Sequence, residues 1–361
     1  MTANSRKIQS YQKTMKENFN TKLNGKQISL YTLKNTNGIE LSLTNYGARI
    51  VSCLVPSSDG DIADVVLGYD SIEGYFNSNE LYFGATIGRY ANRIENAKIK
   101  LGNQLIILEK NEPPNHLHGG SKGFHSVVWD VQKVEPNRVT FRHISANGED
   151  EYPGEVQVEV SYSLNDNNEI TIEYLAVSDK KTILNLTNHA YFNLSGAGSG
   201  SVANHCIEIN ADSFTPVNES MIPTGEFKKV DGTVFDFRAE KPIGKHWDAD
   251  NTQLKYARGY DHNFVLNKNG GRKPEFSARV KDPVSGRVLE VDTTEPGIQF
   301  YTANSLDGSD TGREGVPYES RNAFCLETQH FPNSPNQPNF PSVVLEPGEK
   351  HTSTTIYRFK F

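Results

Sequence analysis

The strongest constraint on the fold is a run of alternating apolar and polar residues. Apolar side chains occupy every second position from Val156 to Leu164. After the turn-forming sequence NDNN at 165–168, the alternation resumes from Ile170 to Tyr174. Because successive side chains point to opposite faces of a strand, this pattern predicts two half-buried strands joined as an antiparallel hairpin.

The same period of two recurs along the chain, whereas helical periodicity is scarce. Further strands are expected at 39–43, 129–131, 139–141, 234–237 and in the C-terminal TTIYRFKF. Short helices are expected near 71–78 and 250–258. Many short strands, separated by turns in a chain with 29 Gly and 17 Pro, predict an all-β antiparallel sandwich or barrel.

No linker or repeat divides the 361 residues, so we expect a single domain over 26–361. Residues 1–25 are polar and predict a mobile N-terminal tail without the apolar content to pack. The chain has no signal-peptide core and no apolar run long enough to span a membrane. We therefore expect a cytoplasmic protein, although a periplasmic or secreted protein whose leader had been removed would look the same.

Charge and cysteine content narrow the classes of partner. A net charge of −7 provides no basic patch, which argues against nucleic acid and anionic membranes and favours a neutral small molecule. Cys53, Cys206 and Cys325 lie far apart in sequence and predict reduced thiols rather than a disulfide framework.

Polar residues concentrate in a few stretches of this strand-rich sequence. They are GRYANRI at 88–94, NHLHGG at 115–120, LTNHAYFNL at 186–194, GYDHNF at 259–264 and CLETQHFPNSPNQPNF at 325–340. Most place a titratable group beside aromatic and amide side chains, which is typical of sugar sites. Taken singly, Arg93 is explained as a solvated charge, His189 as a core histidine and Asp261 as a turn cap.

Two features of these stretches invite a chemical interpretation. Glu327 follows Phe324, Cys325 and Leu326, which indicate a buried strand, and buried glutamates are rare unless paired or functional. His116 and His118 are two residues apart, so in an extended segment both imidazoles would face one cavity or one metal. A metal site needs three or four ligands, and no acidic residue lies close enough in sequence to complete one, so no metal is expected.

In their order along the chain, GRYANRI, NHLHGG, LTNHAYFNLSG, YDHNF, EPGIQFYT and ETQHFPNSPNQPNFPSVVLEPGE resemble the signature segments of the aldose 1-epimerases, also called galactose mutarotases. The similarity runs from about residue 27 to the C-terminus. The resemblance implies a large antiparallel β-supersandwich, an isomerase activity on a monosaccharide, and no cofactor. It places sugar-contacting residues at Asn92, Arg93, His118, His189, Asp261, Gln299 and Glu327, and leaves His116 outside the site.

The resemblance and the chemistry of these side chains together predict a mechanism. Ionised Glu327 takes the proton of the O1 hydroxyl, and His189, as imidazolium, donates a proton to the ring oxygen O5. The remaining residues hold the open chain while C1 turns. We expect free aldohexoses such as glucose and galactose as substrates, and a monomer or homodimer.

Three alternatives remain open from the sequence. A glycoside hydrolase would use Asp261 and Glu327 as paired carboxylates. A hexose-6-phosphate epimerase would need a basic cluster near the motifs, and the sequence shows none there. A non-catalytic sugar-binding protein would keep the fold but have no need for both an acid and a base.

Overall fold

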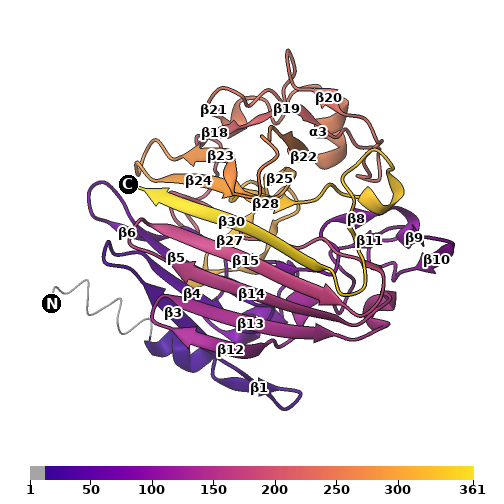
Figure 1. Cartoon of the computed structure of the whole chain (residues 1–361). Coiled ribbons are helices and arrows are strands. Elements are labelled where there is room, and N and C mark those ends of the chain that lie inside the picture. Colours follow the sequence, from indigo (N-terminus) through magenta and orange to yellow (C-terminus); the bar gives the residue numbers. More distant parts are fainter. Residues whose placement is uncertain (1–12) are drawn as a thin grey trace.

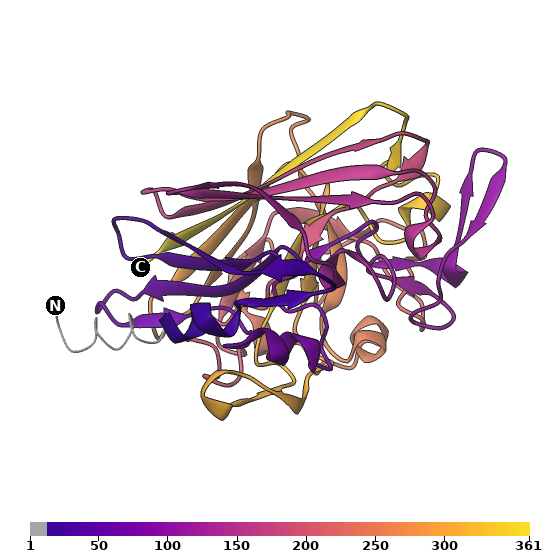
Figure 2. The same cartoon turned by 90° about the horizontal axis from the view of Figure 1, so that it is seen from below.

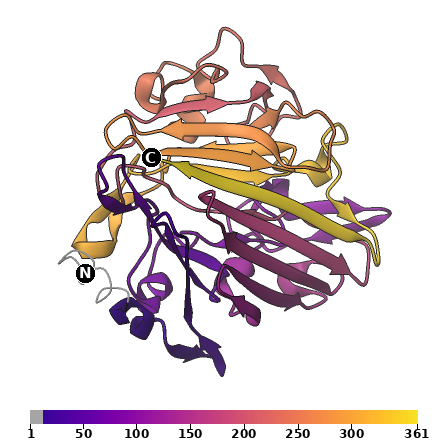
Figure 3. The ribbon, with the colours of Figure 1, turned by 60° about the vertical axis from the view of Figure 1, so that its left-hand side comes forward.

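A nine-stranded antiparallel sheet is the largest element of the computed structural model, which describes residues 13–361 (Figure 1). In spatial order its strands are β12 (Asp130–Glu135), β13 (Arg138–Ser145), β14 (Val156–Leu164), β15 (Glu169–Ser178), β30 (Lys350–Lys360), β24 (Val288–Thr293), β23 (Glu275–Lys281), β18 (Cys206–Ile209) and β21 (Lys241–Pro242). The predicted hairpin forms β14 and β15, with Val160 opposite Tyr174. The C-terminal strand β30 joins the two halves of the sheet, as Figure 3 shows.

Two smaller antiparallel sheets complete the layers. The four-stranded sheet contains β3 (Leu30–Lys34), β4 (Glu40–Thr44), β5 (Arg49–Pro56) and β6 (Ile62–Asp64), and Figure 2 shows it as an indigo layer beneath the magenta strands. The five-stranded sheet has the order β20 (Lys228–Lys229), β19 (Ala211–Phe214), β22 (Asp261–Leu266), β25 (Gly297–Tyr301) and β28 (Cys325–Gln329).

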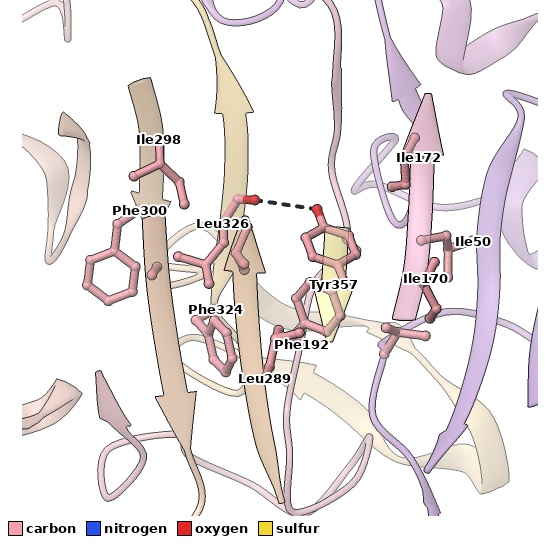
Figure 4. Close-up of a cluster of buried hydrophobic side chains, with 14 of the residues drawn as sticks. Ile50, Ile170, Ile172, Phe192, Leu289, Ile298, Phe300, Phe324, Leu326 and Tyr357 are labelled. Atoms are coloured by element: carbon pink, nitrogen blue, oxygen red, sulfur yellow. Dashed lines mark hydrogen bonds between the residues drawn. The ribbon is translucent and has the colours of Figure 1, made fainter. Parts of the chain in front are cut away.

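Apolar side chains of all three sheets meet in a shared core (Figure 4). The large sheet contributes Ile170, Ile172, Leu289 and Tyr357, the five-stranded sheet contributes Ile298, Phe300 and Leu326, and the four-stranded sheet contributes Ile50. Complete burial of one such side chain stabilises the fold by about 1.5–3 kcal/mol. The layered antiparallel architecture confirms the predicted all-β supersandwich.

Short strand pairs and helices connect these layers. The pairs are β1 (Thr21–Leu23) with β2 (Lys26–Ile28), β7 (Thr86–Ile87) with β17 (Thr187–Asn188), β8 (Arg93–Ile94) with β11 (His116–Leu117), β9 (Lys98–Leu101) with β10 (Gln104–Ile107), β16 (Thr182–Ile183) with β29 (Val344–Leu345) and β26 (Asp307–Thr311) with β27 (Pro317–Glu319). The two predicted helices are α2 (Ile72–Phe76) and α3 (Thr252–Ala257). Side chains of Ser71 and Asn251 accept hydrogen bonds from the first-turn N–H groups of α2 and α3, respectively, which fixes where each helix begins.

The N-terminal segment departs from the sequence prediction. Residues 13–18 are helical, and Met15 and Phe19 are buried against the α2 region, where the rings of Phe19 and Tyr75 lie 6.0 Å apart. Residues 13–25 therefore pack on the domain instead of forming a mobile tail, because two well-spaced apolar side chains suffice to anchor them. Residues 1–12 of the predicted tail lie outside the described residues.

The strand predicted at 234–237 is also wrong. Val234 and Phe235 form a turn, and residues 236 and 237 are irregular. Thr233 Oγ1 donates a hydrogen bond to the Val230 carbonyl and accepts one from the Phe235 N–H, which closes a local turn in place of a ladder. The apolar residues that suggested alternation, Phe235 and Phe237, are buried from this turn. Within residues 13–361, no helix is both long and apolar enough to cross a membrane.

Candidate active site

A cavity lies on the face of the five-stranded sheet that points away from the core of Figure 4. Leu326 of β28 packs into that core, so the next residue, Glu327, points to the opposite face. The cavity is lined by Glu80, Tyr82, Asn92, Arg93, Leu117, His118, His189, Tyr191, Asp261, Tyr301, Ser305 and Glu327. It therefore gathers six of the seven predicted site residues, from segments more than 200 positions apart.

Strand register brings the carboxylates of the site together. In the β22–β25–β28 ladder, Gln299 lies opposite Glu327 and Tyr301 lies opposite Asp261. The side-chain amide of Gln299 donates to Asp261 Oδ1 over 2.6 Å. Gln299 is the one predicted site residue that is not among those lining the cavity, and its observed contact fixes the orientation of Asp261.

Arg93 is held between two carboxylates. Its Nε and Nη2 donate to the two oxygens of Glu112 over 2.8 and 2.6 Å, and its Nη1 lies 3.8 Å from Asp261 Oδ2. The neighbouring Asn92 accepts the Arg93 N–H on its side-chain oxygen. A bidentate pair of this kind fixes the plane of the guanidinium, so Arg93 is a preorganised donor rather than a solvated surface charge.

His116 and His118 do not share a cavity. Strand β11 ends at Leu117, and His118 has a φ of 51°, which breaks the alternation of side chains. The His116 ring contacts the Tyr152 hydroxyl and the Glu109 carbonyl, each over 2.7 Å, whereas His118 lines the cavity. His116 thus lies outside the cavity, as the sequence analysis expected.

The glycine after His118 is required by close packing. Gly119 has a φ of +85°, and a Cβ at this position would lie 1.9 Å from the carbonyl oxygen of Gly88. Glycine alone meets both demands without strain. The pair of glycines in NHLHGG therefore turns the chain directly behind His118.

Three of the cavity side chains form a set with metal-ligating atoms. The ring nitrogens of His118 and His189 and a carboxylate oxygen of Glu327 lie within 4.8 Å of one another. However, His118 Nδ1 accepts a hydrogen bond from the Asn92 backbone N–H over 3.1 Å. Burial lowers the pKa of His118 well below its usual value, so the neutral ring carries its proton on Nε2 and has no free lone pair for a metal. The same tautomer makes His118 a hydrogen-bond donor toward a ligand.

His189 and Glu327 form a buried pair, with Nε2 of the histidine 3.5 Å from Oε1 of the glutamate. The backbone of His189 is fixed by hydrogen bonds to Ala85 and Gly84. Burial lowers the pKa of His189 to about 3, and burial together with the charges of Asp261 and Glu80 raises the pKa of Glu327 well above its usual value. In the empty cavity the shared proton therefore resides on Glu327, which reverses the charge states expected from the sequence, because low-dielectric surroundings favour a neutral pair over an ion pair.

Several lining residues were missed by the sequence analysis. Tyr191 lies in the LTNHAYFNL stretch that had been singled out for its histidine, Tyr301 is the last residue of β25, and Ser305 follows that strand. Glu80 and Tyr82 precede the GRYANRI stretch and have no local pattern that marks them as site residues. Their position in the cavity depends on long-range packing alone.

Comparison with known proteins places this site in a family. The family model for aldose 1-epimerase matches residues 29–358. The chain is 45% identical to galactose mutarotase from Bos taurus, covering 89% of this chain and 91% of the relative. It is 39% identical to aldose 1-epimerase from Escherichia coli, covering 93% and 96% of the two chains.

Solved structures agree with this assignment. The GalM/aldose epimerase homologue from C. elegans superposes with a TM-score of 0.85 at 32% identity, covering 92% of this chain and 99% of the other. Galactose 1-epimerase from Lactobacillus acidophilus superposes with a TM-score of 0.82 at 30% identity, covering 94% and 96%. The chain belongs to the aldose 1-epimerase family, and its enzyme class is that of the isomerases.

Proposed function

We propose that this protein interconverts the α and β anomers of free aldohexoses such as glucose and galactose, with Glu327 and His189 as the proton carriers. The proposal rests on one observation: the cavity of this family member holds a buried acid–base pair 3.5 Å apart. Mutarotation needs two proton transfers, one at the O1 hydroxyl and one at the ring oxygen O5. Two coupled groups that share one proton provide both.

As the sugar binds, the shared proton passes from Glu327 Oε1 to His189 Nε2, 3.5 Å away. In the forward direction, the ionised Glu327 then takes the O1 proton while His189 Nε2 donates its proton to O5, and the C1–O5 bond breaks. The aldehyde then turns about C1–C2, and the two proton transfers run in reverse as the ring closes on the other face of C1. Ring opening ends with a protonated Glu327 and a neutral His189, which is the distribution that burial favours in the empty cavity. The buried surroundings therefore lower the energy of the open-chain state relative to the charged starting pair.

The other lining residues supply directional contacts to the sugar. Arg93, fixed by Glu112, donates to hydroxyl oxygens, and Asp261 accepts from hydroxyl hydrogens. His118 donates through Nε2, and Asn92 offers a side-chain amide at the same rim. Such contacts keep the open chain in place while C1 turns. Gln299 acts indirectly, because its side-chain amide orients Asp261.

The contacts of Asp261 argue against a glycoside hydrolase. Asp261 is engaged by Gln299 at 2.6 Å and faces Arg93 at 3.8 Å, so both of its oxygens already have partners. Glu327 is paired with His189 instead of with a second carboxylate. A hydrolase would need Asp261 and Glu327 free on either side of a glycosidic oxygen.

The charges of the cavity argue against a phosphorylated sugar. Among its lining residues only Arg93 carries a fixed positive charge, whereas Glu80, Asp261 and Glu327 all contribute carboxyl groups. A phosphate dianion would meet unfavourable like charges there. The third alternative, a sugar-binding protein without activity, leaves the close acid–base pair without a role.

Asp261 and Glu327 of the cavity lie on the five-stranded sheet, which shares one core with the other two sheets. This supports a single catalytic domain over 26–361, which we expect to act as a monomer or in a homodimer.

Polarimetry tests the proposed function directly. Freshly dissolved α-D-glucose and α-D-galactose should approach anomeric equilibrium faster with the protein than in buffer alone. Methyl α-D-glucopyranoside, which has no free O1 hydroxyl, serves as the control and should neither change rotation nor release glucose. Release of glucose from this glycoside would instead identify a hydrolase. If both sugars reach anomeric equilibrium no faster with the protein than in buffer alone, the proposal is refuted.

A further inference from the structure

The imidazole of His189 is flanked by two stacked tyrosine rings. Among the described residues, no partner bonds its Nδ1, and Nε2 faces Glu327. The ring of Tyr191 stacks on the imidazole at 5.0 Å with an interplanar angle of 21°, and the ring of Tyr82 does so at 5.8 Å and 23°. A catalytic histidine is usually oriented by a carboxylate or carbonyl on its second nitrogen, so the two tyrosines take over that task here.

One carboxyl group connects both tyrosines. Glu80 Oε1 accepts the backbone N–H of Tyr82 over 3.0 Å, and the Tyr191 hydroxyl interacts with the Glu80 carboxyl. Glu80 is a half-buried residue of the cavity wall, and its carboxyl group contacts the backbone of Tyr82 as well as the Tyr191 side chain. The reaction scheme above gives Glu80 no proton to carry.

The segment that carries Glu80 is itself anchored. Asp310 of β26 accepts the backbone N–H of Asn79 over 2.9 Å and that of Glu80 over 2.8 Å. The Ser78 hydroxyl also bonds the same carboxylate. A continuous set of contacts thus runs from Asp310 through Glu80 to the two tyrosines that flank His189.

We propose that Glu80 is a positioning residue for His189: the Glu80 carboxyl group holds the Tyr82 backbone and the Tyr191 hydroxyl, so that the two stacked rings keep His189 Nε2 aligned with Glu327 and with the substrate. This inference rests on the proposed function for its kinetic consequence. Without Glu80, both rings lose their common anchor and the imidazole samples orientations that do not reach O5. Misplacement of a catalytic group by about 1 Å can reduce the rate about 100-fold.

Four variants test this role: Glu80→Ala, Glu80→Gln, Tyr191→Phe and the double variant Glu80→Ala/Tyr191→Phe. Glu80→Ala should lower kcat about 10- to 100-fold while KM changes less than about threefold, because alignment and not sugar contact is lost. Glu80→Gln should regain most of the activity, since its amide oxygen accepts the Tyr82 N–H and its NH₂ donates to the Tyr191 oxygen. In the double variant, Tyr191→Phe should add less than about a twofold loss to that of Glu80→Ala, as expected for two residues acting through one contact.

Tyr318→Phe is the matched control. Tyr318 is a buried tyrosine whose hydroxyl donates to Gly68, and it does not line the cavity. Its variant should keep the wild-type kcat. A wild-type kcat in Glu80→Ala, equal losses in Glu80→Ala and Glu80→Gln, or multiplicative losses in the double variant would overturn the proposal.

Nuclear magnetic resonance of the His189 side chain gives a readout that does not depend on turnover. Glu80→Ala should shift and broaden the imidazole signals of His189, and Tyr318→Phe should leave them unchanged. Unaltered His189 signals in Glu80→Ala would overturn the positioning role even if the wild-type protein had no mutarotase activity. Absence of activity in the wild-type protein with altered His189 signals would instead refute the proposed function alone.

Discussion

His189 Nε2 lies 3.5 Å from Glu327 Oε1, and both side chains are almost fully buried. At this separation the two groups form one acid–base unit, whose net charge is the same whichever partner holds the shared proton. The unit provides a donor and an acceptor at every stage of ring opening and closure. Burial and the charges of Asp261 and Glu80 favour a protonated Glu327 when no sugar is bound.

The pH dependence of activity should reflect this unit and not an ordinary histidine. Because burial lowers the pKa of His189 to about 3, the pair takes up a second proton only in strongly acidic solution. The acid limb of the buffer-corrected polarimetric kcat should therefore lie well below pH 6.5, the usual pKa of histidine. Circular dichroism at each pH checks that the protein stays folded. A loss of activity centred near pH 6.5 as the pH falls would show that His189 titrates as an exposed imidazole.

Substitutions at two glycines with positive φ distinguish the cost of backbone strain from the cost of a steric clash. Gly102 has a φ of +63° and open space where a Cβ would be, whereas a Cβ at Gly119 would meet the Gly88 carbonyl at 1.9 Å. Gly102→Ala should lower the free energy of unfolding by about 1 kcal/mol, from the φ angle alone. Gly119→Ala should cost about 1–3 kcal/mol more and should lower kcat/KM by displacing His118. Equal costs in urea unfolding would refute the packing argument.

The role of His116 is tested through its partner. Tyr152→Phe removes the hydroxyl that contacts His116 Nε2 over 2.7 Å and should lower the free energy of unfolding by about 1 kcal/mol. Since His116 lies outside the cavity, kcat and KM should stay within about twofold of the wild-type values. His118 is two positions after His116 and lines the cavity, so His118→Ala should instead raise KM. A marked loss of kcat in a fully folded Tyr152→Phe variant would place His116 in the catalytic site.

Much of the fold follows from local sequence patterns. The alternation from Val156 to Leu164, interrupted by NDNN, is the central hairpin of the large sheet. The segment 234–237 shows where prediction from apolar spacing is wrong. The Thr233 hydroxyl donates a hydrogen bond to the backbone and stabilises a turn where the spacing alone predicts a strand. The prediction of a mobile tail is wrong for residues 13–25 for a different reason. The burial of Met15 and Phe19 depends on a surface built from residues far along the chain.

The candidate site also has residues that the sequence predicts and features that it does not. Glu327 could be singled out because a glutamate after three apolar residues of a strand is unusual, and the structure buries it. The distinction between His116 and His118 could not be drawn from spacing, since it depends on where β11 ends. The protonation of the His189–Glu327 pair in the empty cavity differs from the charge states predicted for the reacting pair, because the sequence does not show how completely the pair is buried or that Glu80 lies beside it.

The matched control for the central claim is a second buried pair. Glu295 and His330, 2.6 Å apart, form a similar acid–base contact, and neither residue lines the cavity. Glu295→Gln should therefore leave the rate of mutarotation near the wild-type value, which shows that loss of a buried carboxylate does not by itself abolish activity.

The most direct measurement is the polarimetric rate of α-D-galactose mutarotation for wild type, Glu327→Gln, His189→Asn and the double variant. If the two groups act as one unit, each single variant should lose about 10²- to 10⁴-fold. The double variant should then be about as slow as the slower single variant, not slower by the product of the two losses. A wild-type rate in either single variant, or losses that multiply in the double variant, would contradict proton sharing between Glu327 and His189.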